Sequence, residues 1–550
     1  MLVWPMLFTS SGIGGDWEHH LWYVWQQSLA VHRNLAPSLF LNTPYSVFYP
    51  HYLFYGATIN ALTAALSLLP ASTPTTAYVG TYILSFAAAY GGWYWAARIA
   101  GLGRIAAQAP ALVYITSTCY LTLIYGEGDW PALLASSMMP LMVAAGLSVL
   151  RAKQASVLPS LALAGSTIIF FGSHNITILW GSTVLAATGL LVVVCVPEAR
   201  RLLEVRSLIR FASVFLPAAL VNSWFLLPTI AYASHTKIAS EIKYLDQHYT
   251  IGATSFDQAF SLSRATSVAG TPDYALALPT LVIAWVLVSL VVVLWSVRRG
   301  SWVRVLLIFC AVTAAIVATM TRGEILSVLP EPYTILQFGY RLDAYILLGV
   351  TAAVLATLVL IRAGSQRLRL YGWTIVPALI VSVIGAVQQV NAYQRTPLPR
   401  SVTFSPGAEV FAKTYNDYTY APLPLIYGKP LPRLEVAPAA IRDNRFSGSI
   451  RMRPGQLVYT NIGGGPDLLH ITGAEVVGRD PSYHLVLAMG PNTAIRSAHP
   501  TTALATEHLT IAPAETLPVV LGRLLSLGSI IVLAGELAWL LTRRLRKKAR

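Results

Sequence analysis

The feature that most limits the fold of this chain is a series of apolar runs of about 20 residues, each long enough to cross a bilayer as a helix. Hydrophobic residues make up 55% of the 550 residues and charged residues only 11%, whereas a soluble protein carries about 25% charged residues. The composition therefore excludes an ordinary soluble protein and predicts a polytopic, all-α membrane protein.

The net charge of +15 would suit a nucleic-acid partner, but the positions of the basic residues argue against one. Just over half of the Lys and Arg lie in short connectors between apolar runs and in the tail Arg543–Arg550, as the positive-inside rule expects. We therefore expect membrane lipids around the chain and no nucleic acid. The first apolar run, Met1–Thr9, is about half the length of a span, so either the first helix extends through Ile13 or the natural start lies upstream, and we expect the latter.

The apolar run Phe48–Leu69 is long enough to span, but a crossing there would break the alternation of basic connectors. We interpret it as a re-entrant or interfacial segment. The other runs predict about 12 spanning helices with both termini in the cytoplasm. They are the N-terminal anchor, Thr76–Ala97, Ile105–Tyr125, Pro131–Leu150, Val157–Gly172, Ile176–Val196, Ile209–Ala231, Tyr274–Val297, Val305–Thr321, Leu342–Ile361, Trp373–Val390 and Leu517–Leu541.

Residues 392–514 have a different pattern, in which short β-branched or aromatic runs alternate with turn signals. The predicted strands are Gln456–Thr460, Leu468–Thr472 and Tyr483–Leu487. The predicted organisation is therefore a membrane domain over 1–391, a β-rich extracytoplasmic domain over 392–514, and a final helix with a basic cytoplasmic tail over 515–550. The first outer loop, 14–75, belongs to the membrane domain.

This first outer loop is the densest in groups that can do chemistry. Asp16 follows two glycines and precedes an amphipathic helix predicted over Asp16–His32, so it is the candidate catalytic base. It could equally serve as the N-cap of that helix, and the two roles are compatible. Asp16 and Glu18 could share a divalent cation, Mg²⁺ or Mn²⁺, only if Asp16 lies before the helix, because positions i and i+2 do not face each other.

The same loop supplies further candidate ligand contacts. His19 is adjacent to His20, so the two side chains point apart and do not form a two-histidine metal site. Aromatic residues in such a loop more often form an interfacial belt than a platform for a sugar. Among them, Trp22 and Tyr23 are the candidate ligand contacts, because they lie off the apolar stripe formed by Trp17, Leu21, Val24, Trp25 and Leu29. His51 is a further polar group of this loop.

Other outer segments also carry candidate binding residues. Glu127 and Asp129 lie in a turn between two spans, where solvated acids are also expected. His174 and Asn175 lie between two apolar runs, where a polar group needs a cavity or a hydrogen-bond partner. Arg322 and Arg341 would suit a lipid-linked phosphate, unless Arg341 only pairs with Asp343 or Glu324 at the surface.

The sequences GGDWEHH and FYPHYLFYGATINAL resemble the first outer loop of GT-C glycosyltransferases, which use polyprenyl-phosphate sugars. The sequences IYGEGDWPALLASSMMPLM, FFGSHNITIL and ILQFGYRLDAY are similar to the bacterial membrane proteins called "6-pyruvoyl-tetrahydropterin synthase-related". The resemblance covers residues 14–391. It departs at Gln337–Arg341, where that family commonly has Gln-Phe-Pro-Trp-Arg.

The resemblance implies a GT-C-like bundle in the bacterial inner membrane, with interfacial juxtamembrane helices and an extracytoplasmic active site. It implies Asp16 as the base and Arg341 as a contact of the donor phosphate, with a sugar moving from a polyprenyl phosphate to a glycan, lipid or protein of the envelope. The alternatives are a transporter or flippase for a lipid-linked saccharide and a non-catalytic assembly protein. Polar residues concentrated at the outer ends of the helices favour an interfacial enzyme over a transporter.

Overall fold

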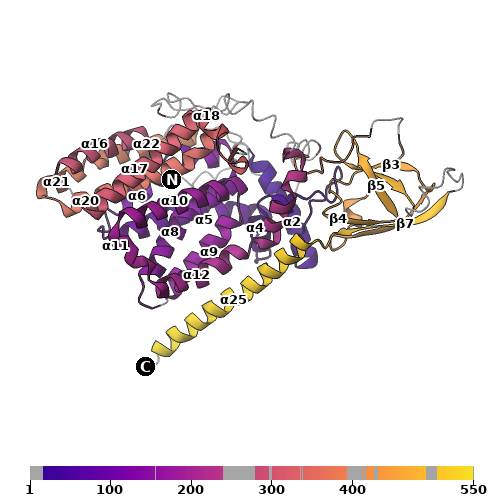
Figure 1. Ribbon diagram of the computed structural model, residues 1–550, viewed down its shortest axis with the longest axis horizontal. Helices are drawn as coiled ribbons and strands as arrows, with labels where there is room; N and C mark the ends of the chain where they lie inside the picture. The colour runs from indigo at the N-terminus through magenta and orange to yellow at the C-terminus, as the bar shows by residue number, and fades with distance from the viewer. Residues whose placement is uncertain are drawn as a thin grey trace.

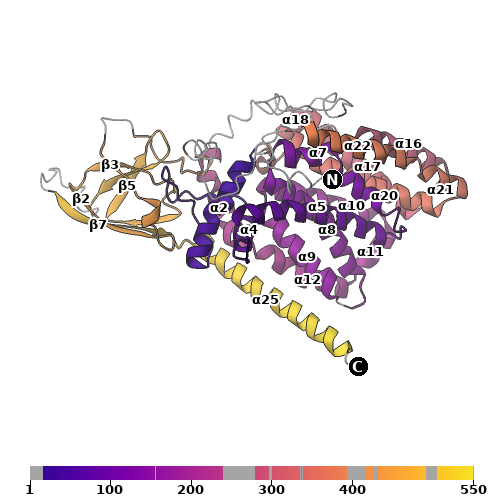
Figure 2. The ribbon, with the colours of Figure 1, turned by 180° about the vertical axis from the view of Figure 1, so that it is seen from behind.

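The computed structural model describes residues 16–154, 156–239, 260, 279–296, 300–334, 336, 339–392, 413, 416–426, 431–490 and 504–548. A helical bundle forms most of the molecule, and a β-rich region lies at one end of it (Figure 1). The last helix, α25 (Leu517–Lys548), begins beside the β-rich region and runs along the bundle, so that the C-terminus lies far from the strands (Figures 1 and 2).

The first outer loop folds into three helices: α2 (Trp17–Asn34), α3 (His51–Phe54) and α4 (Ala57–Leu66). The predicted amphipathic helix is therefore confirmed, but its buried face differs from the predicted stripe. Leu29 is exposed, whereas Trp22 and Tyr23 are buried in an aromatic cluster with residues of the following loop. The helix is covered on a second side by its own loop, which the periodicity of one helix cannot show.

The ambiguous apolar run at Phe48–Leu69 does not form one long helix. Helix α3 has 4 residues and α4 has 10, and Gly56 joins them with a φ of +52°. At a rise of about 1.5 Å per residue, α4 is far shorter than the hydrocarbon core of a bilayer. The length of α4 agrees with the prediction that this segment does not cross the membrane.

The bundle itself begins at residue 74. The described helices of the bundle fall at the predicted spans, except that the N-terminal anchor lies outside the described residues. They are α5 (Pro74–Ile99), α6 (Gln108–Ile115), α7 (Thr118–Leu121), η1 (Thr122–Gly126), α8 (Trp130–Arg151), α9 (Val157–Phe171), α10 (Asn175–Cys195), α12 (Val205–Leu220), α13 (Ser223–Tyr232), α16 (Thr280–Ser296), α17 (Ser301–Thr321), α20 (Asp343–Ala363), α22 (Ile375–Ala392) and α25.

Short helical turns complete the connections between these helices. They are α11 (Pro197–Arg200), η2 (Arg201–Leu203), η3 (Ala233–His235), α18 (Gly323–Ser327), α19 (Glu331–Thr334), η4 (Gly339–Leu342) and α21 (Gln366–Gly372).

The described helices do not reproduce the predicted count of twelve spans. Among the described residues, 6 helices are long and apolar enough to cross a membrane, or up to 8 if each of two bent pairs counts as one span. The bent pairs lie at predicted spans, Ile105–Tyr125 and Ile209–Ala231, and bend by 53° and 63°. Helix α9, with 15 residues, and the described part of α16, with 17, are not among these 6 helices. The chain is a multi-pass membrane protein, with a packing core that also contains broken and short helices.

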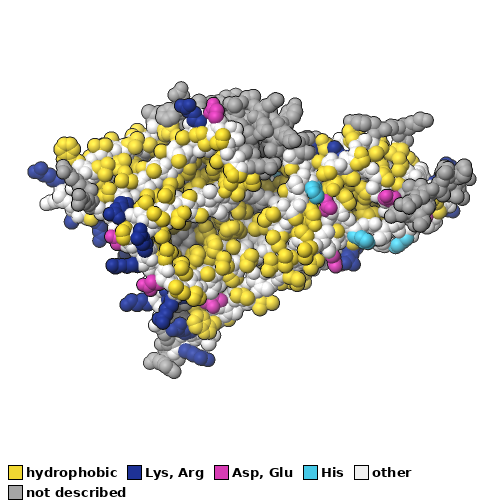
Figure 3. All heavy atoms as spheres, in the orientation of Figure 1, with side chains coloured by type: hydrophobic (Ala, Val, Ile, Leu, Met, Phe, Trp, Pro, Cys, Tyr) yellow, Lys and Arg dark blue, Asp and Glu magenta, His cyan; other side chains and the backbone are white. Residues whose placement is uncertain are grey.

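Charge is distributed unevenly over the bundle surface. In Figure 3, hydrophobic side chains cover the middle of the visible face, and most Lys and Arg side chains lie at the end of the bundle away from the β-rich region. Arg151, Arg200 and Arg304 belong to this end, where each donates a hydrogen bond to a backbone carbonyl near a helix terminus. Such cations interact favourably with the C-terminal ends of helices.

The β-rich region consists of two sheets. One has the order β1–β3–β6–β5, with β1 (Arg433–Leu434), β3 (Leu457–Thr460), β6 (Leu485–Met489) and β5 (Ala474–Arg479). The other has the order β2–β7–β4, with β2 (Phe446–Met452), β7 (Ala505–Pro513) and β4 (Leu469–Thr472). All pairs are antiparallel except β1 with β3. The three strands named from the sequence correspond to β3, β4 and β6.

The core of the β-rich region includes residues from the first outer loop. Phe40, Val47 and Phe48 are almost completely buried and belong to the same hydrophobic cluster as Leu485, Leu487 and other strand residues. In addition, the amide of Val47 donates to the carbonyl of Asn461, at 2.7 Å. The β-rich region is therefore packed directly onto the first outer loop through one shared core.

Candidate functional site

A hollow of about 350 Å³ lies where the helical bundle meets the β-rich region, and we call it the outer hollow. Its lining comes from segments that are far apart in the sequence: Asp16, His19, His20, Tyr23, Phe54, Tyr55, Asp129, His174, Asn175, Ile176, Thr229, Ala233, Thr236, Ile238, Ala239, Arg341, Asp417 and Tyr418. Seven of the residues predicted from the sequence line it together: Asp16, His19, Tyr23, Asp129, His174, Asn175 and Arg341.

Asp16 lies immediately before α2, and its side chain is 69% exposed. No hydrogen bond from its side chain caps the helix, so the alternative role as an N-cap is not realised through a side-chain bond. Its backbone amide donates to the carbonyl of Glu127 at 2.5 Å, which ties the first outer loop to the second. The side chain faces His19 Nδ1 at 3.6 Å.

The surroundings of Asp16 favour its ionised form. Partial burial by itself raises the pKa of this carboxyl, but a hydrogen bond from His19 and the nearby positive charges of His20, His19 and Arg341 outweigh burial, so the pKa is lowered from its usual value. Asp16 is consequently a carboxylate at neutral pH, in the state that can accept a proton. A carboxylate with a lowered pKa is a weak base in solution, and its usefulness here depends on its position.

Glu127 and Asp129 are positioned by a distorted turn between α7 and α8. Residues Thr122–Gly126 form a π-helical turn, in which the amide of Glu127 donates to the carbonyl of Thr122 at 2.7 Å. Such turns are frequent at functional sites because they shift side chains out of the regular helical register. Gly128 follows with a φ of +68°, and Asp129 then caps α8 by accepting a hydrogen bond from the amide of Ala132 at 3.2 Å.

Both acids of this turn are buried, contrary to the expectation that they could be ordinary solvated loop residues. Burial, followed by the negative charge of Asp129, raises the pKa of Glu127 to about 8, even though Arg341 acts in the opposite direction. Glu127 is therefore mostly protonated at neutral pH and can donate a hydrogen bond.

His174 precedes α10 and is buried. Its Nδ1 accepts a hydrogen bond from the amide of Thr177 at 3.3 Å and lies 2.8 Å from the Thr177 hydroxyl, so the ring is fixed as a helix cap. Burial lowers its pKa to about 4, so the ring is neutral at pH 7. The side-chain amide of Asn175 donates to the backbone carbonyl of Phe54 at 2.6 Å, which joins this loop to α3. His174 and Asn175 therefore satisfy both expectations for buried polar groups: they make structural hydrogen bonds, and they line the outer hollow.

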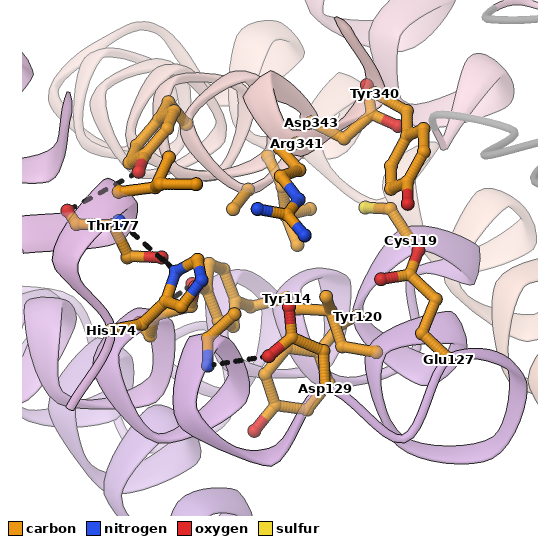
Figure 4. A pocket seen from close by; sticks show the side chains of 17 residues that line it. Tyr114, Cys119, Tyr120, Glu127, Asp129, His174, Thr177, Tyr340, Arg341 and Asp343 are labelled. Atoms are coloured by element: carbon orange, nitrogen blue, oxygen red, sulfur yellow. Dashed lines mark hydrogen bonds between the residues drawn. The ribbon is translucent and has the colours of Figure 1, made fainter. Parts of the chain in front are cut away.

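Arg341 lies between the outer hollow and a smaller neighbouring pocket, which we call the inner pocket, and lines both. In Figure 4 its guanidinium points towards the side of the inner pocket formed by His174, Asp129 and Glu127. The inner pocket also contains Asp343, whose side chain is only 2% exposed and whose two oxygens have no hydrogen-bond partner among the described residues. The predicted alternative of an exposed Arg341–Asp343 surface pair is therefore wrong, because Asp343 is buried and Arg341 is only partly exposed.

A cluster of aromatic rings lies behind the outer hollow. The ring of His51 is completely buried and stacks on Tyr23 with centroids 3.8 Å apart. Burial, with a smaller contribution from the charge of His20, lowers the pKa of His51 well below its usual value. The hydroxyl of Tyr52 donates to the carbonyl of Tyr23 at 2.7 Å. These contacts hold the wall of the outer hollow in a fixed position. The side chains that form this part of the wall are uncharged.

Four predicted site residues lie outside the lining of both cavities, while Glu127 lines only the inner pocket. Trp22 and His51 are buried behind the outer hollow, Glu18 is partly exposed on α2, and Arg322 is exposed between α17 and α18. The sequence reasoning missed Tyr55, Asp417 and Tyr418, which do line the outer hollow. Tyr55 sits within a motif that was recognised, but no pattern in the sequence signals Asp417 or Tyr418.

Within the described parts of the chain, no group of three or more His, Cys, Asp and Glu residues is arranged to hold a metal ion. In particular, Asp16 and Glu18 are not joined there by a third such ligand. A divalent cation at Asp16 and Glu18 stays a prediction, and general-base catalysis by Asp16 does not require it.

Comparison with known proteins gives the following. No protein-family model and no curated protein matches the chain. Among solved structures, the Archaeoglobus fulgidus oligosaccharyltransferase AglB with an inhibitory peptide and a dolichol-phosphate is similar, with a TM-score of 0.45 and 12% identity over 79% of this chain. The chain spans only 61% of the length of AglB. ArnT from Cupriavidus metallidurans has a TM-score of 0.31 and 14% identity, over 89% of this chain and 97% of ArnT.

Proposed function

We propose that the chain is an integral membrane glycosyltransferase that moves a sugar from a polyprenyl-phosphate donor to an acceptor hydroxyl of the cell envelope. The observation that carries this proposal is the convergence of Asp16, Asp129, Arg341 and His174 on one hollow at the end of the bundle. The choice of reaction rests on the resemblance of the first outer loop to GT-C glycosyltransferases. We also propose that the chain belongs with the bacterial membrane proteins called "6-pyruvoyl-tetrahydropterin synthase-related".

In this mechanism the donor phosphate lies against Arg341. Its guanidinium offers several donors in a planar fork, which suits phosphate oxygens and stabilises the negative charge that develops as the phosphate leaves. The partly buried position of Arg341 strengthens this interaction, because water screens it less than at an exposed site. The polyprenyl chain would extend into the surrounding lipid.

Asp16 acts on the acceptor. Its carboxylate accepts the proton of the acceptor hydroxyl while the oxygen forms a bond to the anomeric carbon of the donor sugar. The bond from that carbon to the phosphate oxygen breaks, and the polyprenyl phosphate leaves with the electron pair. A positioned general base contributes about 10²–10⁴-fold to such a step. Asp129 accepts hydrogen bonds from sugar hydroxyls in the same hollow, and the neutral His174, whose Nδ1 already accepts from the amide of Thr177, donates one from its Nε2.

The orientation follows from the charge distribution. The basic connectors gather at the end of the bundle away from the β-rich region (Figure 3), and cytoplasmic connectors are the basic ones. The hollow and the β-rich region would then be extracytoplasmic in a bacterial inner membrane, and the C-terminal tail cytoplasmic.

The test is transfer from a panel of radiolabelled polyprenyl-phosphate sugars by purified protein in nanodiscs, with Asp16→Asn compared with wild type. We expect about 10²–10⁴-fold slower transfer by Asp16→Asn with an unchanged thermal midpoint. Glu435→Gln is the matched control, since Glu435 is an exposed carboxylate of the β-rich region that lines neither cavity. Equal rates for Asp16→Asn and wild type would remove Asp16 as the base. No transfer from any donor, together with binding of the lipid, would favour a transporter or an assembly protein.

A further inference from the structure

A short segment ahead of the β-strands, residues 416–420, lies against the membrane part of the chain. It pairs with residues 235–238 through an antiparallel bridge between Thr236 and Tyr420. Three backbone hydrogen bonds of 2.9 Å surround this bridge: Ile238 to Asp417, Lys237 to Thr419, and Ala421 to His235. The Lys237 ammonium also donates to the side-chain oxygen of Asn416 at 2.7 Å. This segment therefore forms a fixed part of the wall of the outer hollow.

Within this segment, Tyr418 is held firmly but remains only half-buried. Its backbone amide donates to the hydroxyl of Tyr49 at 3.1 Å, and its ring stacks on Phe54 with centroids 5.5 Å apart and planes at 22°. The rings of His51, Tyr49 and Tyr55 also lie near it, with centroids at 6.0, 6.2 and 6.5 Å. Packing against the aromatic cluster thus fixes the orientation of a tyrosine ring that lines the outer hollow.

The two cavities differ in size and in part of their lining. Arg341, Asp129 and His174 line both cavities, whereas Tyr418, Asp417 and Tyr55 line only the outer hollow. Both cavities combine aromatic rings with carboxylates, but the outer hollow, at about 350 Å³, is much larger than the inner pocket, at about 30 Å³. A sugar ring has an apolar face of C–H groups and a rim of hydroxyl donors, so it can use both kinds of group at once.

We propose that Tyr418 is a specificity-determining residue, the platform on which a sugar ring of a glycan acceptor lies, with Asp417 beside it in the lining. This inference rests on the proposed function, and it identifies the acceptor as a saccharide and not a lipid or a protein. It also gives the β-rich region a role: that region shares its core with the first outer loop and follows the segment that completes the acceptor site.

The test measures binding by the full-length protein in nanodiscs of two kinds of probe, a panel of octyl glycosides and undecaprenyl phosphate. The variants are Tyr418→Ala, Tyr418→Leu and Tyr418→Phe, and Leu preserves apolar contact with Phe54 without an aromatic face. The affinity is compared for the glycoside that wild type binds most tightly. We expect Tyr418→Ala and Tyr418→Leu to lower this affinity by about tenfold or more, and Tyr418→Phe to lower it by less than about threefold. Undecaprenyl phosphate should bind to all of them within about twofold of wild type.

Tyr420→Ala is the matched control, because Tyr420 is a tyrosine of the same segment that does not line the outer hollow. Octyl glycoside binding that is unchanged in Tyr418→Leu, or lost equally in Tyr420→Ala, would overturn the proposal, as would a wild type that binds no glycoside. The transfer assay is independent of this result. If glycoside binding depends on Tyr418 but no transfer occurs, the glycosyltransferase proposal fails and the saccharide site stands. If transfer occurs but does not depend on Tyr418, the glycosyltransferase proposal stands and the role of Tyr418 fails.

Discussion

Replacing Glu127 by Gln tests the electrostatics of the site most directly. Gln has nearly the same size and shape as Glu but cannot ionise, so it removes only the cost of a buried charge. Because burial raises the pKa of Glu127 from 4.5 to about 8, the folded protein holds a proton at this position that the unfolded chain releases above about pH 4.5.

The sign and size of the effect follow from linkage. For an acid with a raised pKa, the folded state binds more protons between about pH 4.5 and 8, so wild-type stability falls as the pH rises through this window and is level above it. Each pKa unit corresponds to about 1.4 kcal/mol, so the penalty at pH 7 is on the order of 3 kcal/mol. Glu127→Gln lacks this penalty.

The assay is the thermal denaturation midpoint in detergent between pH 5 and pH 9. We expect Glu127→Gln to match wild type near pH 5 and to denature at progressively higher temperature than wild type up to pH 8, after which the difference stays constant. Glu435→Gln, at an exposed carboxylate, should show no such trend. A difference between Glu127→Gln and wild type that does not change with pH would refute the reasoning.

Three further predictions concern the same region. Gly128→Ala places a side chain at a φ of +68° and should cost about 1–2 kcal/mol in stability and reduce transfer, as measured by denaturation and the transfer assay. Asp129→Ala removes the cap of α8 and should cost about 1 kcal/mol, whereas Asp129→Asn keeps the cap and should lose binding alone; equal destabilisation would contradict this. Tyr52→Phe removes the hydrogen bond to the Tyr23 carbonyl and should cost about 0.5–1.5 kcal/mol, while leaving octyl glycoside binding unchanged.

Local pattern in the sequence was enough to predict much of the framework. Apolar runs located the helices of the bundle, because a helix in lipid must be both long and apolar wherever it occurs. Alternation located β3, β4 and β6 in the same way. The distribution of basic residues also predicted that Phe48–Leu69 does not span, but it did not predict the break into α3 and α4 at Gly56. The count of twelve spans stays a prediction: the described residues contain 6 to 8 helices or helix pairs that could cross a membrane, α9 is short, and two predicted spans are bent.

Some residues of the candidate site were also predictable from the sequence, and others were not. Asp16, Asp129, His174 and Arg341 could be named from the sequence because charged and polar groups stand out at the ends of apolar runs. Tyr418 could not, since an aromatic residue in a β-rich stretch is unremarkable until the fold brings it to Tyr49, 369 residues away. Trp22 shows the reverse: periodicity favoured it as a ligand contact, and packing placed it behind the wall. Sequence determines which residues can do chemistry, and long-range packing decides which of them face the same cavity.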